Sequence, residues 1–95
     1  MELKRLAETL KILGDPTKLK MIILLTEKEY CVSDFVEVIN ISQPSISKHL
    51  SLLKSVGLVT ESRRGMWVYY SLNSQALENV KQAIDDISIY LDKIE

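Results

Sequence analysis

The sequence predicts a single, mainly helical domain that carries a small β-hairpin. Its 95 residues, 46% of them apolar, suffice for one small core and leave little room for a second. Apolar residues recur at helical spacing along most of the chain, and two short β-rich segments flanking a glycine interrupt this pattern. No repeat, linker or low-complexity segment divides residues 1–95, so we expect one domain over that range.

Two helices are predicted at the start of the chain. Apolar residues follow helical spacing over residues 2–13, and residues 14–16 supply a glycine stop, an aspartate N-cap and a proline for the next first turn. Residues 17–26 are apolar around most of the helix, which predicts a core helix buried on most sides. Residues 29–32 are β-like and form a short connector.

Two further helices separated by a tight turn are predicted next. Ser33 can cap a short helix that Asn40 ends. Ser42 can cap a second helix over residues 43–56, and Gly57 ends it. Two helices joined by so short a turn have the layout of a helix-turn-helix.

The outer face of the helix over residues 43–56 is unusually small and polar. Ile46, Leu50 and Leu53 form one apolar stripe, and the opposite face carries Pro44, Ser47, Lys48, Ser51 and Ser55. Small hydroxyls and a single lysine let the backbone approach another surface closely, as a helix in a DNA major groove requires. For this helix alone, a serine-rich surface helix without a partner is an equal alternative.

A hairpin follows this helix. Residues 58–62 and 66–72 are β-rich, and Arg63, Arg64 and Gly65 between them suit a tight turn. A hairpin directly after a recognition helix is a wing, so the predicted fold is a winged helix-turn-helix. We expect both arginines to lie at the tip and to contact phosphate or the minor groove, rather than only to solubilise a loop.

The last predicted helix, residues 74–94, carries an apolar seam. The seam residues recur at spacings of three and four: Leu77, Val80, Ile84, Ile87, Leu91 and Ile94. Such a stripe on a terminal helix of a small domain usually needs a second chain to cover it, and burial within one chain is the alternative.

Charge and cysteine content narrow the function. The net charge is −1, but residues 42–65 are basic and residues 74–95 are acidic. Cys31 is the only cysteine, which excludes an intrachain disulfide and a multi-cysteine metal cage within one chain. No apolar run is long enough to span a bilayer, so we expect a cytoplasmic protein.

Enzymatic activity is not expected. The chain has no evident activated nucleophile, phosphate-cradling glycine loop or paired carboxylates. We therefore assign no catalytic residues and no cofactor.

Several linked motifs carry a resemblance that covers nearly the whole chain. They are residues 14–19 (GDPTKL), 31–34 (CVSD), 42–50 (SQPSISKHL), 53–59 (LKSVGLV) and 67–72 (WVYYSL). In this order they closely resemble the ArsR/SmtB family of bacterial and archaeal transcriptional repressors. The resemblance implies a winged-helix homodimer paired through its first and last helices, residues 2–13 and 74–94. Such a dimer would sit on an inverted-repeat operator in double-stranded DNA until an effector loosens it.

The resemblance also implies which residues meet DNA. Gln43, Ser45, Ser47 and Lys48 would approach bases and phosphates in the major groove, and the candidate surface further includes Ser42, Pro44, His49, Arg63 and Arg64. His49 flanks the buried stripe, so a packed histidine that is hydrogen-bonded within the protein is as good an interpretation as DNA contact.

The usual sensors of the family are missing. Metal-sensing members typically use cysteines at the start of the third helix or aspartate and histidine ligands on the last helix. Here the cysteine pair has become Cys31-Val32-Ser33, and the last helix has no histidine or cysteine. Asp85 and Asp86 are better explained as a solvated acidic face, so we assign no metal site.

The sequence leaves three alternatives open. Cys31 precedes a helix N-terminus, where a lone thiol could be oxidised, although inert core is the more common role of such a residue. The effector could also be a partner protein or a small molecule at the dimer interface. Finally, the polar helix could bind protein instead of DNA; Leu52 is its only apolar anchor, and we expect it to turn inward towards the wing.

Overall fold

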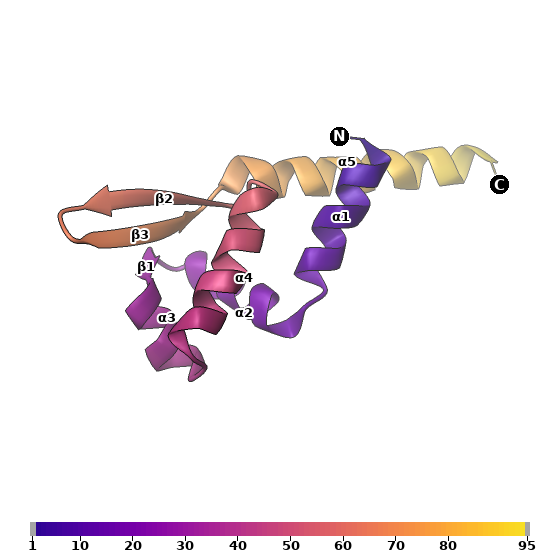
Figure 1. Cartoon of the computed structure of the whole chain (residues 1–95). Coiled ribbons are helices and arrows are strands. Elements are labelled where there is room, and N and C mark those ends of the chain that lie inside the picture. The colour runs from indigo at the N-terminus through magenta and orange to yellow at the C-terminus, as the bar shows by residue number, and fades with distance from the viewer. Residues whose placement is uncertain (1, 95) are drawn as a thin grey trace.

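The computed structural model describes residues 2–94, with side chains described for residues 2–86 (Figure 1). The elements in chain order are α1 (Leu3–Leu13), α2 (Pro16–Leu25), β1 (Tyr30–Cys31), α3 (Val32–Ile39), α4 (Gln43–Ser55), β2 (Val59–Arg64), β3 (Trp67–Leu72) and α5 (Ser74–Ile94). This order confirms the predicted winged helix-turn-helix. No helix within residues 2–94 is long and apolar enough to cross a membrane.

The junction between α1 and α2 follows the sequence signals, but the burial of α2 does not. Asp15 is the N-cap of α2, and its carboxylate accepts a 3.0 Å hydrogen bond from the backbone N–H of Lys18. Leu19 and Ile23 are 45% and 56% exposed, whereas Lys18 is buried. The expectation that α2 is buried on most sides was therefore wrong, because a helix of this small domain turns one face inward and the other to solvent.

The N-cap of α3 also differs from the prediction. Cys31, not Ser33, is the capping residue, and its backbone N–H donates a 3.0 Å hydrogen bond to the carboxylate of Asp34. This hydrogen bond is the main reason why the pKa of Asp34 is lowered. At the other end Asn40 adopts a left-handed conformation with φ 62°, so it ends α3 as expected.

A three-stranded antiparallel sheet of order β1-β3-β2 forms the wing and its base. Arg63 lies opposite Val68 and Arg64 lies opposite Trp67, so both arginines belong to β2 and not to the turn. The loop between the paired ends consists of Gly65, which has φ 62°, and residue 66. The turn therefore lies one step further along the chain than predicted. Strand pairing extends β2 through both arginines, and within the loop Gly65 takes the positive φ.

The main core lies between α2, α3, α4 and the base of the sheet. Its fully buried side chains are Met21, Phe35, Ile46, Leu50, Leu53, Leu58 and Val59. Phe35 stacks on Tyr30 with ring centroids 4.7 Å apart, which joins α3 to β1. The predicted stripe of α4 is therefore the side that the core buries.

A second, smaller cluster joins α1 to α5. Leu6 packs with Val80 and Ala83 of the same chain. Ile84, one residue beyond Ala83, is 46% exposed, and Leu3 and Leu10 of α1 are exposed too. Within the described side chains, the seam of α5 is thus partly covered by its own chain and partly open. The remaining seam positions, Ile87, Leu91 and Ile94, lie outside the described side chains.

Candidate nucleic-acid interface

The first turn of α4 is held by Ser42. Its hydroxyl oxygen accepts a 3.3 Å hydrogen bond from the backbone N–H of Ser45, and its hydroxyl donates to Oγ of Ser45 at 3.0 Å. Gln43 and Pro44 occupy the first two helical positions, where proline removes a backbone donor that lacks a helical partner. The start of α4 is therefore ordered by local contacts, while Ser45 keeps its own hydroxyl proton free for another acceptor.

The outer face of α4 is open to solvent along its whole length. Ile46, Leu50 and Leu53 are at most 1% exposed, while every predicted contact residue of this helix region except His49 is exposed. These exposed residues are Ser42, Gln43, Pro44, Ser45, Ser47 and Lys48. Their side chains are short except for those of Gln43 and Lys48, so the helix backbone can approach a partner closely.

His49 faces the N-terminus of α2. Its Nδ1 lies 3.9 Å from Oδ2 of Asp15, too far for a hydrogen bond, and has no hydrogen-bond partner within the described residues. The side chain is 22% exposed. Burial, followed by repulsion from Lys18, lowers the pKa of His49 below 6.5, and Asp15 opposes this only partly. His49 is therefore packed against the domain, but the expected hydrogen bond within the protein is not made at Nδ1. A DNA contact by His49 stays a prediction.

Arg64 is turned towards the body of the domain. Its guanidinium donates a 2.6 Å hydrogen bond to Oε2 of Glu29 and lies 4.8 Å from the ring centroid of Tyr69. The hydroxyl of Ser71 donates to the same carboxylate oxygen at 3.0 Å. Both hydrogen bonds lower the pKa of Glu29, and the one from Arg64 has the larger effect. The charge of Arg64 is therefore already balanced by a carboxylate.

The basic middle of the chain is less available than a charge count suggests. Lys54 forms an ion pair of 2.7 Å with Glu61, and this pairing raises the pKa of Lys54 and lowers that of Glu61. With Arg64 also paired, Lys48 and Arg63 are the cations of residues 42–65 that lack an ion-pair partner within the described part of the chain. The positive charge free to meet phosphate is thus divided between α4 and the wing.

Cys31 lies at the base of the sheet and is 7% exposed. Its Sγ lies 3.1 Å from Oγ of Ser33. Because a reactive thiol must be accessible, this burial favours a structural role over a redox role. Across the residues that the structure describes, no three His, Cys, Asp or Glu side chains gather as metal ligands would.

Leu52 does not turn inward as expected. It is 40% exposed, since its neighbour Leu53 takes the core position. Leu52 is the one large apolar side chain exposed on α4, so this helix lacks the cluster of anchors typical of a protein-binding surface.

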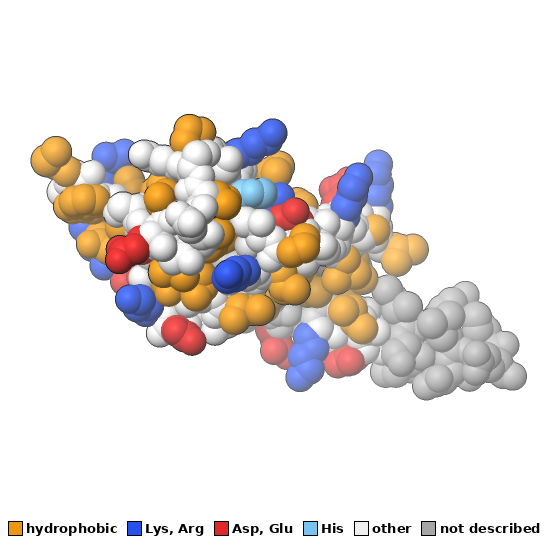
Figure 2. Space-filling view, turned by 90° about the horizontal axis from the view of Figure 1, so that it is seen from below, with side chains coloured by type: hydrophobic (Ala, Val, Ile, Leu, Met, Phe, Trp, Pro, Cys, Tyr) orange, Lys and Arg blue, Asp and Glu red, His pale blue; other side chains and the backbone are white. Residues whose placement is uncertain are grey.

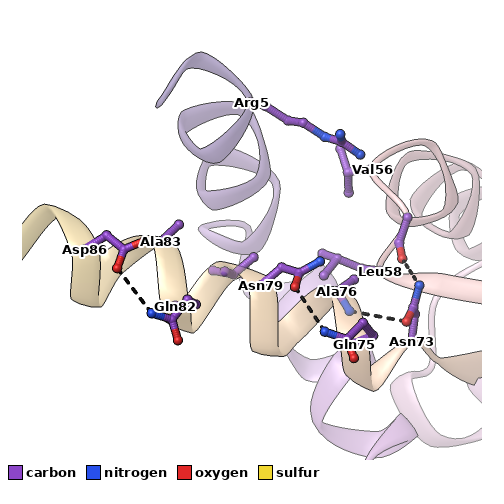
Figure 3. Close-up of a pocket in the computed structure, with 12 residues that line it drawn as sticks. Arg5, Val56, Leu58, Asn73, Gln75, Ala76, Asn79, Gln82, Ala83 and Asp86 are labelled. Carbon is purple, nitrogen blue, oxygen red and sulfur yellow. Dashed lines mark hydrogen bonds between the residues drawn. The ribbon is translucent and has the colours of Figure 1, made fainter. Parts of the chain in front are cut away.

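A groove at the opposite end of α4 was not predicted from the sequence. It has a volume of about 430 Å³ and lies between α1, the end of α4 and the first turns of α5 (Figure 3). At its edge the amide of Asn73 donates to the carbonyl oxygen of Gly57 at 3.0 Å and its Oδ1 accepts from the N–H of Ala76. Asn73 therefore links the end of the recognition helix to the start of α5. Asparagine is a favoured N-cap residue, so Asn73 directly before α5 is the only local signal for this link in the sequence.

A winged helix that presents a short-chained polar helix beside a basic hairpin defines a DNA-binding transcriptional regulator. Comparisons with known proteins give the family. Residues 15–61 match the family described as "Bacterial regulatory protein, arsR family". The chain belongs to the ArsR family.

The most similar relatives include two named repressors. The chain is 41% identical to transcriptional repressor SdpR of Bacillus subtilis (strain 168) over 69 residues, which are 73% of this chain and 77% of that repressor. It is 40% identical over 77 residues to the arsenical resistance operon repressor of Escherichia coli (strain K12), covering 80% of this chain and 66% of that one. The matched proteins are thus regulators of transcription, not enzymes.

Solved structures agree on the fold. An ArsR-like transcriptional regulator from Rhodococcus sp. RHA1 superposes with a TM-score of 0.87, over 95% of this chain and 85% of the other, at 23% identity. At this identity the match supports the arrangement of the elements and nothing finer.

Proposed function

We propose that this regulator is a homodimeric repressor that inserts α4 of each protomer into successive major grooves of an inverted-repeat operator. The observation that carries this proposal is the outer face of α4, where short polar side chains from Ser42 to Lys48 lie exposed beside a fully buried stripe. The names of the two relatives, both repressors, favour repression over activation.

Each exposed side chain has a physical role in this proposal. Gln43 pairs through its amide with an adenine edge, which reads sequence. Ser45 and Ser47 donate hydroxyl protons to phosphate or base, and Lys48 and Arg63 supply charge that is not used within the described part of the chain. His49 contributes by packing α4 against the domain, and Arg64 contributes by holding the wing through its ion pair with Glu29.

The open side of the α1–α5 cluster supports the proposed dimer. Leu3, Leu10 and Ile84 are apolar and at least 40% exposed next to the buried contact of Leu6 with Val80. A second copy related by a two-fold axis would cover them and would present two copies of α4 to two half-sites. We place the protein in the cytoplasm, where it meets its operator.

The effector in this proposal is a small molecule or a partner protein that acts at the dimer interface. The groove of Figure 3 supports this view, because Asn73 joins it directly to the end of α4. Oxidation of Cys31 is the second candidate, and the burial of this thiol counts against it.

Fluorescence anisotropy tests the proposal. The reduced, metal-free protein is titrated onto DNA from upstream of its own gene and onto shuffled DNA of equal length, at two salt concentrations. We expect a preference of about a thousandfold or more for the upstream DNA. Gln43→Ala should reduce the ratio of the affinities for the two DNAs, whereas Lys48→Ala should weaken binding to both DNAs by the same factor. The proposal would be contradicted if both fragments were bound with equal, low affinity and if binding were lost at the higher salt concentration.

A further inference from the structure

The end of the wing is apolar. Met66, in the hairpin loop, is 94% exposed, and Trp67 beside it is 57% exposed. Figure 2 shows hydrophobic side chains at the far end of the wing, with Lys or Arg side chains next to them. Exposed apolar side chains grouped at a projecting tip mark a surface that meets a partner, since a turn that only closes a hairpin needs no apolar side chain.

Paired strands support this tip up to the hairpin loop. Strand pairing between β2 and β3 runs without a break from the Val59 pair to the Arg64–Trp67 pair, directly before the loop. The ion pair of Arg64 with Glu29, together with the contact of Arg64 with Tyr69, anchors the distal end of β2 to the sheet. Met66 therefore lies in a short loop directly after paired strands, and not in a long unpaired segment.

The tip is continuous with the surface assigned to DNA. Gln43, at the start of α4, lines one recess together with Ser33, Trp67 and Val68. Arg63, opposite Val68, adds an exposed positive charge without an ion-pair partner among the described residues. An apolar tip flanked by a free cation and adjacent to the recognition helix matches the chemistry of a DNA groove: apolar base edges and sugars between two phosphate rows.

We propose that Met66 is an apolar wedge that enters the minor groove beside the α4 site and opens a base step, with Trp67 packed against the groove wall. This inference rests on the proposed function. Partial unstacking of one step kinks the duplex towards the major groove, so the protein would favour operators with a flexible pyrimidine–purine step at that position. Met66 would thus contribute to specificity through DNA shape without reading a base.

The test measures bending and wing contact separately from affinity. A DNA fragment selected by the protein from a random-sequence pool carries a donor and an acceptor dye at its ends, so that energy transfer reports bending. Trp67 is the only tryptophan and reports the wing through its emission. We expect increased energy transfer and changed Trp67 emission on binding. Met66→Ala should lose most of both changes and bind about tenfold more weakly, whereas Met66→Leu should retain them.

The outcomes separate this inference from the proposed function. If selection enriches no sequence and the protein binds DNA only weakly, both fail. If the protein binds selected DNA tightly but Met66→Ala leaves affinity, bending and Trp67 emission unchanged, the wedge is wrong and the repressor stands. If Trp67 emission responds to anionic phospholipid vesicles in a Met66-dependent way but not to DNA, the tip serves a membrane surface and the wedge is also wrong. Met66→Ala removes an exposed side chain, so its circular dichroism should match that of the parent protein.

Discussion

Arg64 donates a 2.6 Å hydrogen bond to Glu29, which lies 35 positions earlier in the chain. Glu29 precedes β1 and Arg64 ends β2, so the pair reaches across β3, the central strand. The bond braces the wing and balances the charge of one of its two arginines. Arg63, the adjacent residue, faces the other side of the hairpin, so two neighbouring arginines have different surroundings.

This difference predicts unequal salt effects. Arg63→Ala should reduce the magnitude of the slope of log binding constant against log salt concentration by about 0.9, because one phosphate contact is lost. Arg64→Ala should change the slope much less, since Glu29 already balances that guanidinium. Anisotropy titrations over a salt series measure both slopes. Glu29→Gln is the matched variant: it frees Arg64 and should steepen the slope. Equal losses for the two alanine variants would mean that Arg64 leaves Glu29 to meet phosphate.

Two leucines on different faces of α4 should differ in their effect on stability. Leu50 is 1% exposed in the core, so Leu50→Ala should lower the free energy of unfolding by about 2–5 kcal/mol. Leu52 is 40% exposed, and Leu52→Ala should cost well under about 1 kcal/mol. Urea denaturation followed by circular dichroism at one protein concentration compares them. A large loss for Leu52→Ala would place that side chain in a contact that a single protomer does not make.

His49 predicts a pH dependence of stability. Burial lowers its pKa below 6.5 in the folded protein, so the unfolded chain binds more protons just below pH 6.5. The contribution of the neutral ring is complete above 6.5 and is lost as pH falls towards the lowered folded pKa. The free energy of unfolding should therefore fall between pH 7.5 and pH 5.5, and His49→Gln should fall less. The lowered carboxylate pKa values of Asp15 and Asp34 act at lower pH. Parallel declines in both proteins would exclude His49 as the cause.

The open face of α5 predicts a dimer that one charge can weaken. Ile84 is 46% exposed, and Ile84→Lys should shift the protein towards monomer because a desolvated ammonium at an interface is costly. Glu78→Lys places a lysine at an exposed position of α5 that belongs neither to the Leu6 cluster nor to the groove of Figure 3, and it should leave the dimer intact. Sedimentation velocity at several concentrations distinguishes the two. Dimerisation of the Ile84→Lys protein at the parental affinity would move the interface away from this face.

Features set by neighbouring residues were predicted from the sequence. Asp15, Asn40 and Ser42 were assigned as caps or terminators, and the structure confirms all three. The buried stripe of α4 also followed directly from its spacing, because helix geometry alone decides which side chains share a face. The order of the elements, and with it the family, needed no further information.

Features set by distant segments were not predicted. Cys31 caps α3 in place of Ser33 because its pairing with Tyr69 of β3 determines where the extended chain ends. Leu52 was expected to turn inward towards the wing, but it stays 40% exposed. Where β1 ends, and whether the wing covers a residue of α4, depend on segments that are distant in the chain.

The sequence alone determined the helices and strands of the winged helix-turn-helix and the polar face of α4, because each depends on residue spacing within its own segment. The family followed from linked motifs along nearly the whole chain. Only the tertiary structure decided which charges are free. Arg64 and Lys54 are paired with acids 35 and 7 positions away, and Met66 rather than an arginine stands at the tip of the wing. Ion pairs and strand register depend on which distant segments the fold brings together, and this information is not present in any local stretch of sequence.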